Sequence, residues 1–185
     1  MPSNHQLAAL LARLSYREGD FTLASGARSS FYLDAKQVTY HPDGVALVGR
    51  AVHAIASEFG AEAIGGPTMG ADAIVSSAVY SSASTDRPLT GFIVRKEPKK
   101  HGLGKWIEGI DPQAMNVAIV DDVITSGGSL LKAAEHVRDA GARIVVAMGL
   151  VDREQGGREA IEAAGFPFRA VCTLSEIRAQ FRSAK

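Results

Sequence analysis

The apolar positions near the N-terminus follow first a helical spacing and then a strand spacing. Four leucines are spaced for one face of a helix. These are Leu7, Leu10, Leu11 and Leu14. Residues 21–36 read as two short strands joined by a turn at Ser25 and Gly26. A second helix is expected from Pro42 to Gly60, because proline favours the first helical turn and glycine the position just past the end.

From residue 61 onward, short apolar blocks alternate with segments of helical spacing. The expected strands are 61–66, 88–96, 116–122, 142–153 and 168–174. The expected helices are 70–84, 128–141, 157–165 and 175–182, the last capped by Ser175. Residues 97–115 show no regular pattern. Strands that alternate with helices predict an α/β fold, in which a parallel sheet is flanked by helices on both faces.

The composition narrows the class of protein further. The 185 residues suffice for one domain with a substantial core, so a single domain is expected over 1–185. Twenty basic residues balance twenty acidic ones, so the chain has no net positive charge that would favour binding to nucleic acid. No apolar run approaches the roughly 20 residues of a membrane helix, and the N-terminus lacks the features of a secretion signal. The lone Cys172 is expected to be a buried strand residue. These features indicate a cytoplasmic protein that binds neither nucleic acid nor membrane.

The most informative stretch is VAIVDDVITSGGS, residues 117–129. Asp121 and Asp122 follow an apolar strand, at the edge where a parallel sheet binds its ligand. Adjacent carboxylates repel each other, so this pair indicates a ligand, and carboxylates can accept hydrogen bonds from sugar hydroxyls. Val123 and Ile124 are expected to anchor the turn that follows. The alternative interpretation is that the aspartates cap a helix and the glycines shape a turn.

The loop after the aspartates has the composition of a phosphate site. Gly127 and Gly128 let the backbone approach a ligand closely. Thr125, Ser126 and Ser129 add hydroxyl donors. Successive N–H groups before a helix form an anion-binding nest, and the helix dipole adds partial positive charge. One end of the predicted site therefore suits a phosphate and the other a ribose.

This stretch resembles the signature of the type I phosphoribosyltransferases, which bind 5-phosphoribosyl 1-diphosphate (PRPP). The resemblance implies the type I phosphoribosyltransferase fold. It implies that Asp121 and Asp122 bind the ribose hydroxyls and that residues 123–129 line the 5′-phosphate site. It also implies Mg²⁺ as a cofactor that is bound mainly by PRPP oxygens, with no direct protein ligands.

A second informative stretch is the basic segment VRKEPKKHGLGKWIEG, residues 94–109. Five basic residues fall within seven positions: Arg95, Lys96, Lys99, Lys100 and His101. The segment follows a strand and so begins at the ligand edge, and its length and polarity favour a lid. Cations that close over a diphosphate would stabilise the charge that develops as its bond to C1 breaks. A solvated surface loop is the alternative.

The segment RKEPKKHG resembles the mobile catalytic loop of the orotate phosphoribosyltransferase family. The resemblance implies that Arg95, Lys96, Lys99 and His101 contact PRPP. The implied catalytic set is Lys96, Lys99, His101, Asp121 and Asp122. Because the family's loop reaches into the neighbouring subunit, a homodimer with active sites shared across the interface is implied. The implied reaction transfers the phosphoribosyl group of PRPP to N1 of orotate, in pyrimidine biosynthesis.

Residues 1–40 resemble the family's N-terminal hood, whose aromatic region lies against the orotate ring. This nominates Phe31 and Tyr32, although both could equally be core residues of a hairpin. Arg153 ends a predicted strand, where a guanidinium can pair with the orotate carboxylate. A surface salt bridge is its alternative role. Thr125 is expected to contact orotate as well as phosphate.

The segment GGPTMGAD resembles the family's diphosphate-binding loop, with two departures from the family pattern. Some members carry a lysine at the position of Ala24 and another near Met69 and Gly70, and this chain has neither. Its contacts with orotate or diphosphate are therefore expected to differ in detail.

Two other functions stay open at this point. One is a phosphoribosyltransferase for adenine, hypoxanthine or uracil, which would share the aspartate loop but lack the basic lid and Arg153. The other is a regulator that senses PRPP and binds RNA, which would need a basic face outside the lid.

Overall fold

A computed structural model describes residues 4–22, 26, 28–98 and 106–184. Its strands are β1 (Tyr16–Thr22), β2 (Arg28–Leu33), β3 (Ala63–Pro67), β4 (Thr90–Val94), β5 (Ile107–Gly109), β6 (Asn116–Ile124), β7 (Arg143–Asp152) and β8 (Phe168–Thr173). Its helices are α1 (His5–Leu14), α2 (Lys36–Thr39), α3 (Pro42–Glu58), α4 (Asp72–Ser82), α5 (Gly128–Asp139), α6 (Gly157–Ala163) and α7 (Leu174–Ser183).

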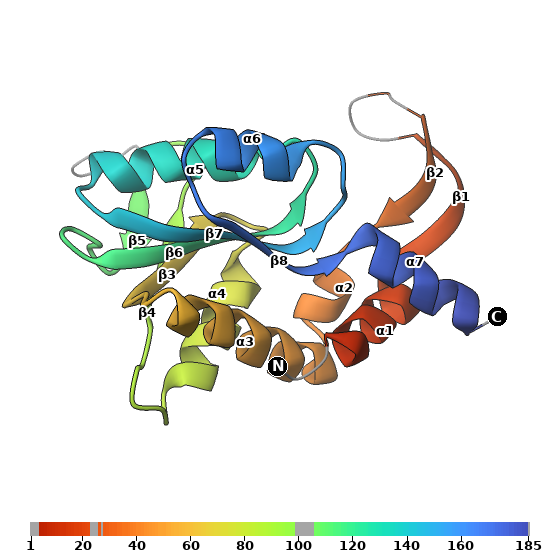
Figure 1. Cartoon of the computed structure of the whole chain (residues 1–185), viewed down its shortest axis with the longest axis horizontal. Coiled ribbons are helices and arrows are strands. Elements are labelled where there is room, and N and C mark those ends of the chain that lie inside the picture. Colours follow the sequence, from red (N-terminus) through yellow and green to blue (C-terminus); the bar gives the residue numbers. More distant parts are fainter. Residues whose placement is uncertain (1–3, 23–25, 27, 99–105, 185) are drawn as a thin grey trace.

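A six-stranded sheet of order β5-β4-β3-β6-β7-β8 forms the centre of the molecule. The pairs β3–β4, β3–β6, β6–β7 and β7–β8 are parallel, and β5 pairs antiparallel with β4 at one edge. Helices α5 and α6 cover one face, and α3 and α4 cover the other (Figure 1). The predicted α/β class, with a parallel sheet between helical layers, is therefore confirmed.

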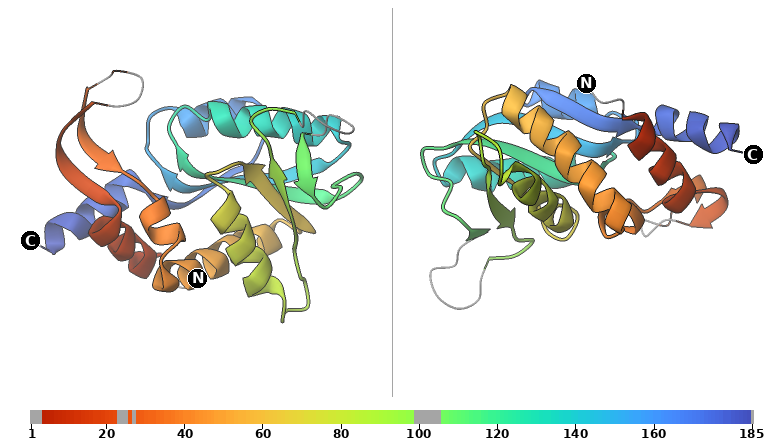
Figure 2. Two further views of the ribbon diagram at one scale, coloured as in Figure 1. Left: turned by 180° about the vertical axis from the view of Figure 1, so that it is seen from behind. Right: turned by 90° about the horizontal axis from the view of Figure 1, so that it is seen from below.

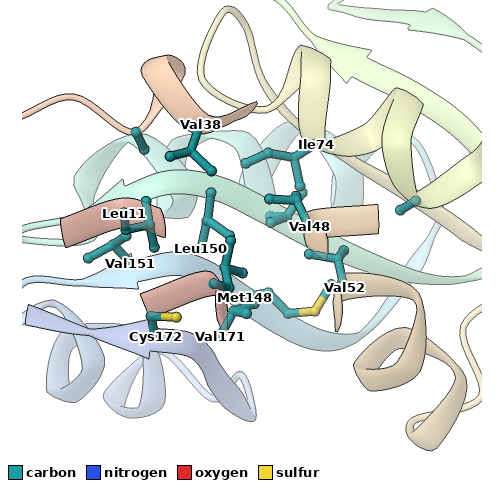
Figure 3. Close-up of a cluster of buried hydrophobic side chains, with 14 of the residues drawn as sticks. Leu11, Val38, Val48, Val52, Ile74, Met148, Leu150, Val151, Val171 and Cys172 are labelled. Carbon is teal, nitrogen blue, oxygen red and sulfur yellow. The ribbon is translucent and has the colours of Figure 1, made fainter. Parts of the chain in front are cut away.

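Each face of the sheet buries its own apolar cluster. The larger cluster joins α1, α3 and α4 to the sheet through side chains such as Leu11, Val52, Ile74 and Met148 (Figure 3). Cys172 lies in this cluster and is buried, as predicted. The second cluster packs α5 and α6 on the opposite face. Because helices bury both faces of the sheet, a ligand can reach it only at the strand ends and the loops after them.

The β1–β2 hairpin stands at one end of the molecule, beside α1 and α7 (Figures 1 and 2). Its first strand begins at Tyr16, five residues earlier than predicted. Gly19 and Asp20 lie in an irregularity of the pairing between Glu18 and Phe21, and the strand continues on both sides of this irregularity. Two aromatic residues join the hairpin to the larger cluster: Tyr16 and Phe31 stack with their ring centroids 5.8 Å apart.

Several local predictions are corrected. Residues 107–109 form β5, although 97–115 showed no pattern, because a strand of three residues is too short for a periodic signal. Helix α2 was likewise missed because it has only four residues. Thr173 and not Ser175 caps α7, in a reciprocal capping box with Glu176. In the described part of the chain, no helix is long and apolar enough to span a membrane.

Candidate active site at the carboxyl edge of the sheet

The two predicted aspartates lie near the carboxyl end of β6, and the strand continues for two residues beyond them. Asp121 is 7% exposed, and its Oδ1 accepts the Asp122 N–H at 2.9 Å. Asp122 Oδ1 in turn accepts the Val123 N–H at 2.8 Å. Burial, reinforced by the Asp122 charge, raises the pKa of Asp121 to about 7. Two carboxylates this close favour a ligand that donates hydrogen bonds to them.

Lys36, at the start of α2, is the most direct partner of this pair, and the sequence did not point to it. Its Nζ lies 2.5 Å from Asp122 Oδ2. Burial alone would lower the pKa of Lys36, but the hydrogen bond and charge of Asp122 raise it above its ordinary value. The ammonium therefore stays charged and compensates part of the acidic charge.

Gly70 closes the other side of the aspartate pair. A Cβ at this position would lie 2.5 Å from Asp121 Oδ1 and 2.8 Å from Asp122 Oδ1. The segment after β3, predicted to form a diphosphate loop, thus packs directly on both carboxylates. A side chain at residue 70 would displace them.

The predicted phosphate loop lies between β6 and α5. Ile124 is buried in the cluster under α5, which fixes the start of the loop, and Val123 is partly buried. Gly127 adopts a left-handed φ of 78° as the N-cap of α5. Of the predicted donors, Thr125, Ser126 and Ser129 are exposed. Within residues 4–22, 26, 28–98 and 106–184, no acceptor takes the N–H groups of 125–129. These groups are available to an anion at the helix N-terminus.

Arg153 follows β7 and lies beside this loop, since its N–H donates to Ile124 O at 2.9 Å. Its guanidinium carbon is 4.7 Å from the Phe31 ring centroid. Phe31 is 6% exposed, whereas Tyr32 is 46% exposed and packs against Phe21 on the opposite side of the strand. The structure therefore brings Arg153 and Phe31 together and places Tyr32 apart from them.

The described part of the basic segment lies next to the aspartates. Arg95 pairs with Glu108 of β5 at 3.3 Å, and its N–H donates to Trp106 O at 2.9 Å. Trp106 stacks on His136 of α5 with a centroid distance of 3.8 Å. This stacking connects the end of the basic segment to α5. Lys99 and His101, two predicted catalytic residues, lie outside the described residues, as does Ala24.

The aspartate pair, the segment at Gly70 and the start of the basic segment line one pocket of about 760 Å³, whereas Arg153 and Phe31 lie outside its lining. Its lining includes Lys36, Met69, Lys96, Asp121, Asp122 and Ser129. The pocket thus combines hydroxyl-accepting carboxylates, cations and the edge of an anion-binding loop. No three His, Cys, Asp or Glu side chains converge as a metal cluster in the ranges that the structure describes.

The fold and the site define the class of protein. Residues 66–166 match the family model of the phosphoribosyl transferase domain. The chain is 40% identical over 180 residues to an orotate phosphoribosyltransferase of Aquifex aeolicus strain VF5, covering 96% of this chain and 98% of that protein. It is 43% identical over 183 residues to the orotate phosphoribosyltransferase of Rhodopirellula baltica, covering 94% and 95%.

A solved structure agrees with these matches. The orotate phosphoribosyltransferase of Mycobacterium tuberculosis H37Rv in complex with PRPP superposes with a TM-score of 0.81 at 33% identity. The match covers 96% of this chain and 99% of that one. The protein therefore belongs to the orotate phosphoribosyltransferase family.

Proposed function

We propose that the protein transfers the 5-phosphoribosyl group of PRPP to N1 of orotate, giving orotidine 5′-monophosphate and diphosphate in pyrimidine biosynthesis. The observation that carries the proposal is the Asp121–Asp122 pair beside the N–H groups of residues 125–129, for which no described residue provides an acceptor. Carboxylates suit ribose hydroxyls, and the loop at the start of α5 suits the 5′-phosphate. A cytoplasmic location is part of the same proposal.

The residues divide the work between binding and charge stabilisation. Asp121 and Asp122 accept hydrogen bonds from the ribose, while Val123, Ile124 and the loop 125–129 position the phosphate. Mg²⁺ bound to PRPP supplies charge neutralisation at the diphosphate. As the C1–O bond to diphosphate breaks, C1 gains positive character and orotate N1, without its proton, forms the new bond.

The basic segment is assigned to the leaving group. Arg95 and Lys96 line the pocket, and Lys99 and His101 follow them in sequence. Cations there stabilise the negative charge that grows on the departing diphosphate. A homodimer, in which this segment serves the partner's site, is part of the proposal.

The base is proposed to lie on the hood side of the site. Arg153 faces the orotate carboxylate, because its buried Nε has no hydrogen-bond partner within the described ranges. The Phe31 ring packs against this guanidinium. Thr125 lies in the loop beside Arg153.

A base panel tests the proposal. The protein with Mg²⁺ and PRPP is supplied in turn with orotate, uracil, adenine and hypoxanthine, and diphosphate release is measured. We expect release with orotate, accompanied by loss of orotate absorbance. Release with another base but not orotate would identify a different phosphoribosyltransferase. No release with any base, together with RNA binding at physiological salt, would favour the regulator.

A further inference from the structure

Two guanidinium groups meet at a single aromatic ring in the hood. Arg153 after β7 and Arg178 on α7 each place the guanidinium carbon 4.7 Å from the Phe31 ring centroid. Burial lowers the pKa of Arg153, and the charge of Arg178 lowers it further. The charge of Arg178 therefore acts against that of Arg153, and the Phe31 ring offers both guanidinium groups a favourable cation–π contact.

No carboxylate in the part of the chain that the structure describes forms a direct ion pair with either arginine; Glu18 Oε1 accepts from the Tyr16 hydroxyl at 3.3 Å, one hydrogen bond away from Arg178. Asp152, beside Arg153, pairs instead with Arg158 at 3.4 Å. Glu154, on the other side, accepts both the N–H and the hydroxyl of Ser175, at 2.8 and 2.6 Å. No ion pair joins a described acid to Arg153 or Arg178, and Arg153 Nε is buried without an acceptor. Unpaired cations with a buried donor point to an anionic ligand.

Hydrogen bonds hold the Arg178 side chain and connect the two segments that carry the arginines. Arg178 Nε donates to the hydroxyl of Tyr16, a buried residue, at 3.1 Å. The Glu154–Ser175 bonds join the loop that carries Arg153 to the first turn of α7. No described residue accepts a hydrogen bond from the two Nη groups of Arg178, which are therefore available to a ligand.

We propose that Arg178 acts with Arg153 to bind the carboxylate of the base substrate, so that α7 takes part in substrate selection. This inference rests on the proposed function and extends it to a residue outside the predicted site. A planar carboxylate can accept hydrogen bonds from both guanidinium groups at once, and its charge removes their repulsion. Arg178 is then the hood-side cation in a chain that has no lysine at position 24.

The test compares Arg178→Gln with Arg178→Lys and with Arg182→Gln, a matched control on the exposed end of the same helix. We expect Arg178→Gln to raise the KM for orotate by about tenfold or more, the effect of losing a charge-assisted hydrogen bond. The KM for PRPP should stay within about twofold. Arg178→Lys should restore part of the affinity, and Arg182→Gln should behave as the wild-type protein.

A second readout separates carboxylate binding from a purely structural role. Inhibition by orotate amide, which lacks the carboxylate charge, is compared with the binding of orotate in each variant. If Arg178 binds the carboxylate, Arg178→Gln weakens orotate much more than the amide. Equal weakening of both ligands, or no change in either, would overturn the inference while orotate turnover by the wild-type protein still supports the proposed function. Absence of that turnover would instead count against the proposed function itself.

Discussion

Lys36 Nζ lies 2.5 Å from Asp122 Oδ2, although the two residues are 86 positions apart in the chain. This ion pair connects α2, just after the β1–β2 hairpin, with the acidic end of β6. Because Asp121 and Asp122 are adjacent and Asp121 is buried, the Lys36 ammonium limits their mutual repulsion. The pair also places a cation in the pocket that is proposed to bind PRPP.

Replacing Lys36 by Met should weaken PRPP binding, because the pocket loses a cation and Asp122 loses its counter-charge. We expect the KM for PRPP to rise about tenfold, in line with the loss of a charged hydrogen bond of about 1.5 kcal/mol. The measurement is steady-state kinetics with orotate saturating. Gln37→Met, an exposed neighbour on α2, is the control. An unchanged KM for PRPP in Lys36→Met would show that the ion pair is only structural.

The raised pKa of Asp121 predicts a pH-dependent stability. A carboxyl group whose pKa is higher in the folded than in the unfolded state stabilises the fold at low pH, and this contribution is lost as pH rises towards about 7. Without ligand, Asp121→Asn should therefore gain stability relative to the wild-type protein as pH rises from about 4 to about 7, by at most about 1.4 kcal/mol per pH unit, with no further gain above that. Urea unfolding at several pH values measures the difference. A difference that does not change with pH would contradict the assignment.

Gly70→Ala should abolish most activity, because its methyl group would lie 2.5 Å from Asp121 Oδ1 and displace both carboxylates. We expect a fall in kcat/KM for PRPP of at least about 100-fold, the order of effect produced by misplacing a reacting group. Gly60→Ala is the control: it has open space but a left-handed φ of 69°, so it should cost about 1 kcal/mol of stability and leave activity intact. Full activity in Gly70→Ala would show that the carboxylates need not hold these positions.

Lys99→Ala tests the assignment of the basic segment to the leaving group. Loss of a cation that acts mainly in the transition state should lower kcat by roughly 100-fold, or about 3 kcal/mol, with little change in orotate binding. Lys100→Ala, which removes the adjacent lysine, is the control and should change kcat by less than about threefold. Steady-state kinetics and orotate titration together distinguish the cases. Parallel losses in turnover and orotate affinity would argue against a transition-state role.

The parts of the site that are contiguous in sequence were predictable. The Asp121–Asp122 pair and the loop 125–129 form one motif, since strand, acids, glycines and helix follow in order. The fold class was predictable for the same reason, because each strand and helix carries its own periodicity. Arg153 could be nominated because it ends a strand at the same edge of the sheet.

Residues that meet only through tertiary packing were missed. Lys36 begins a helix of four residues that is too short for a periodic signal, and nothing local relates it to Asp122. Gly70 gave no sign that two carboxylates pack against it. Arg178 lies next to Ile177, which faces the core, so the inward face of α7 was the only available signal. Tyr32 and Phe31 were nominated together, but adjacent strand residues point to opposite sides, and only Phe31 contacts Arg153.

The central claim is that Asp121 and Asp122 bind the ribose of PRPP, and calorimetric titration of Mg²⁺–PRPP measures this directly. The wild-type protein is compared with Asp121→Asn/Asp122→Asn and with Asp111→Asn, an exposed acid before β6. Thermal unfolding establishes that each variant is folded. We predict that the double variant loses at least about 100-fold in affinity, as expected when two hydrogen bonds to charged groups are weakened, and that Asp111→Asn binds normally. Wild-type affinity in the folded double variant would contradict the account.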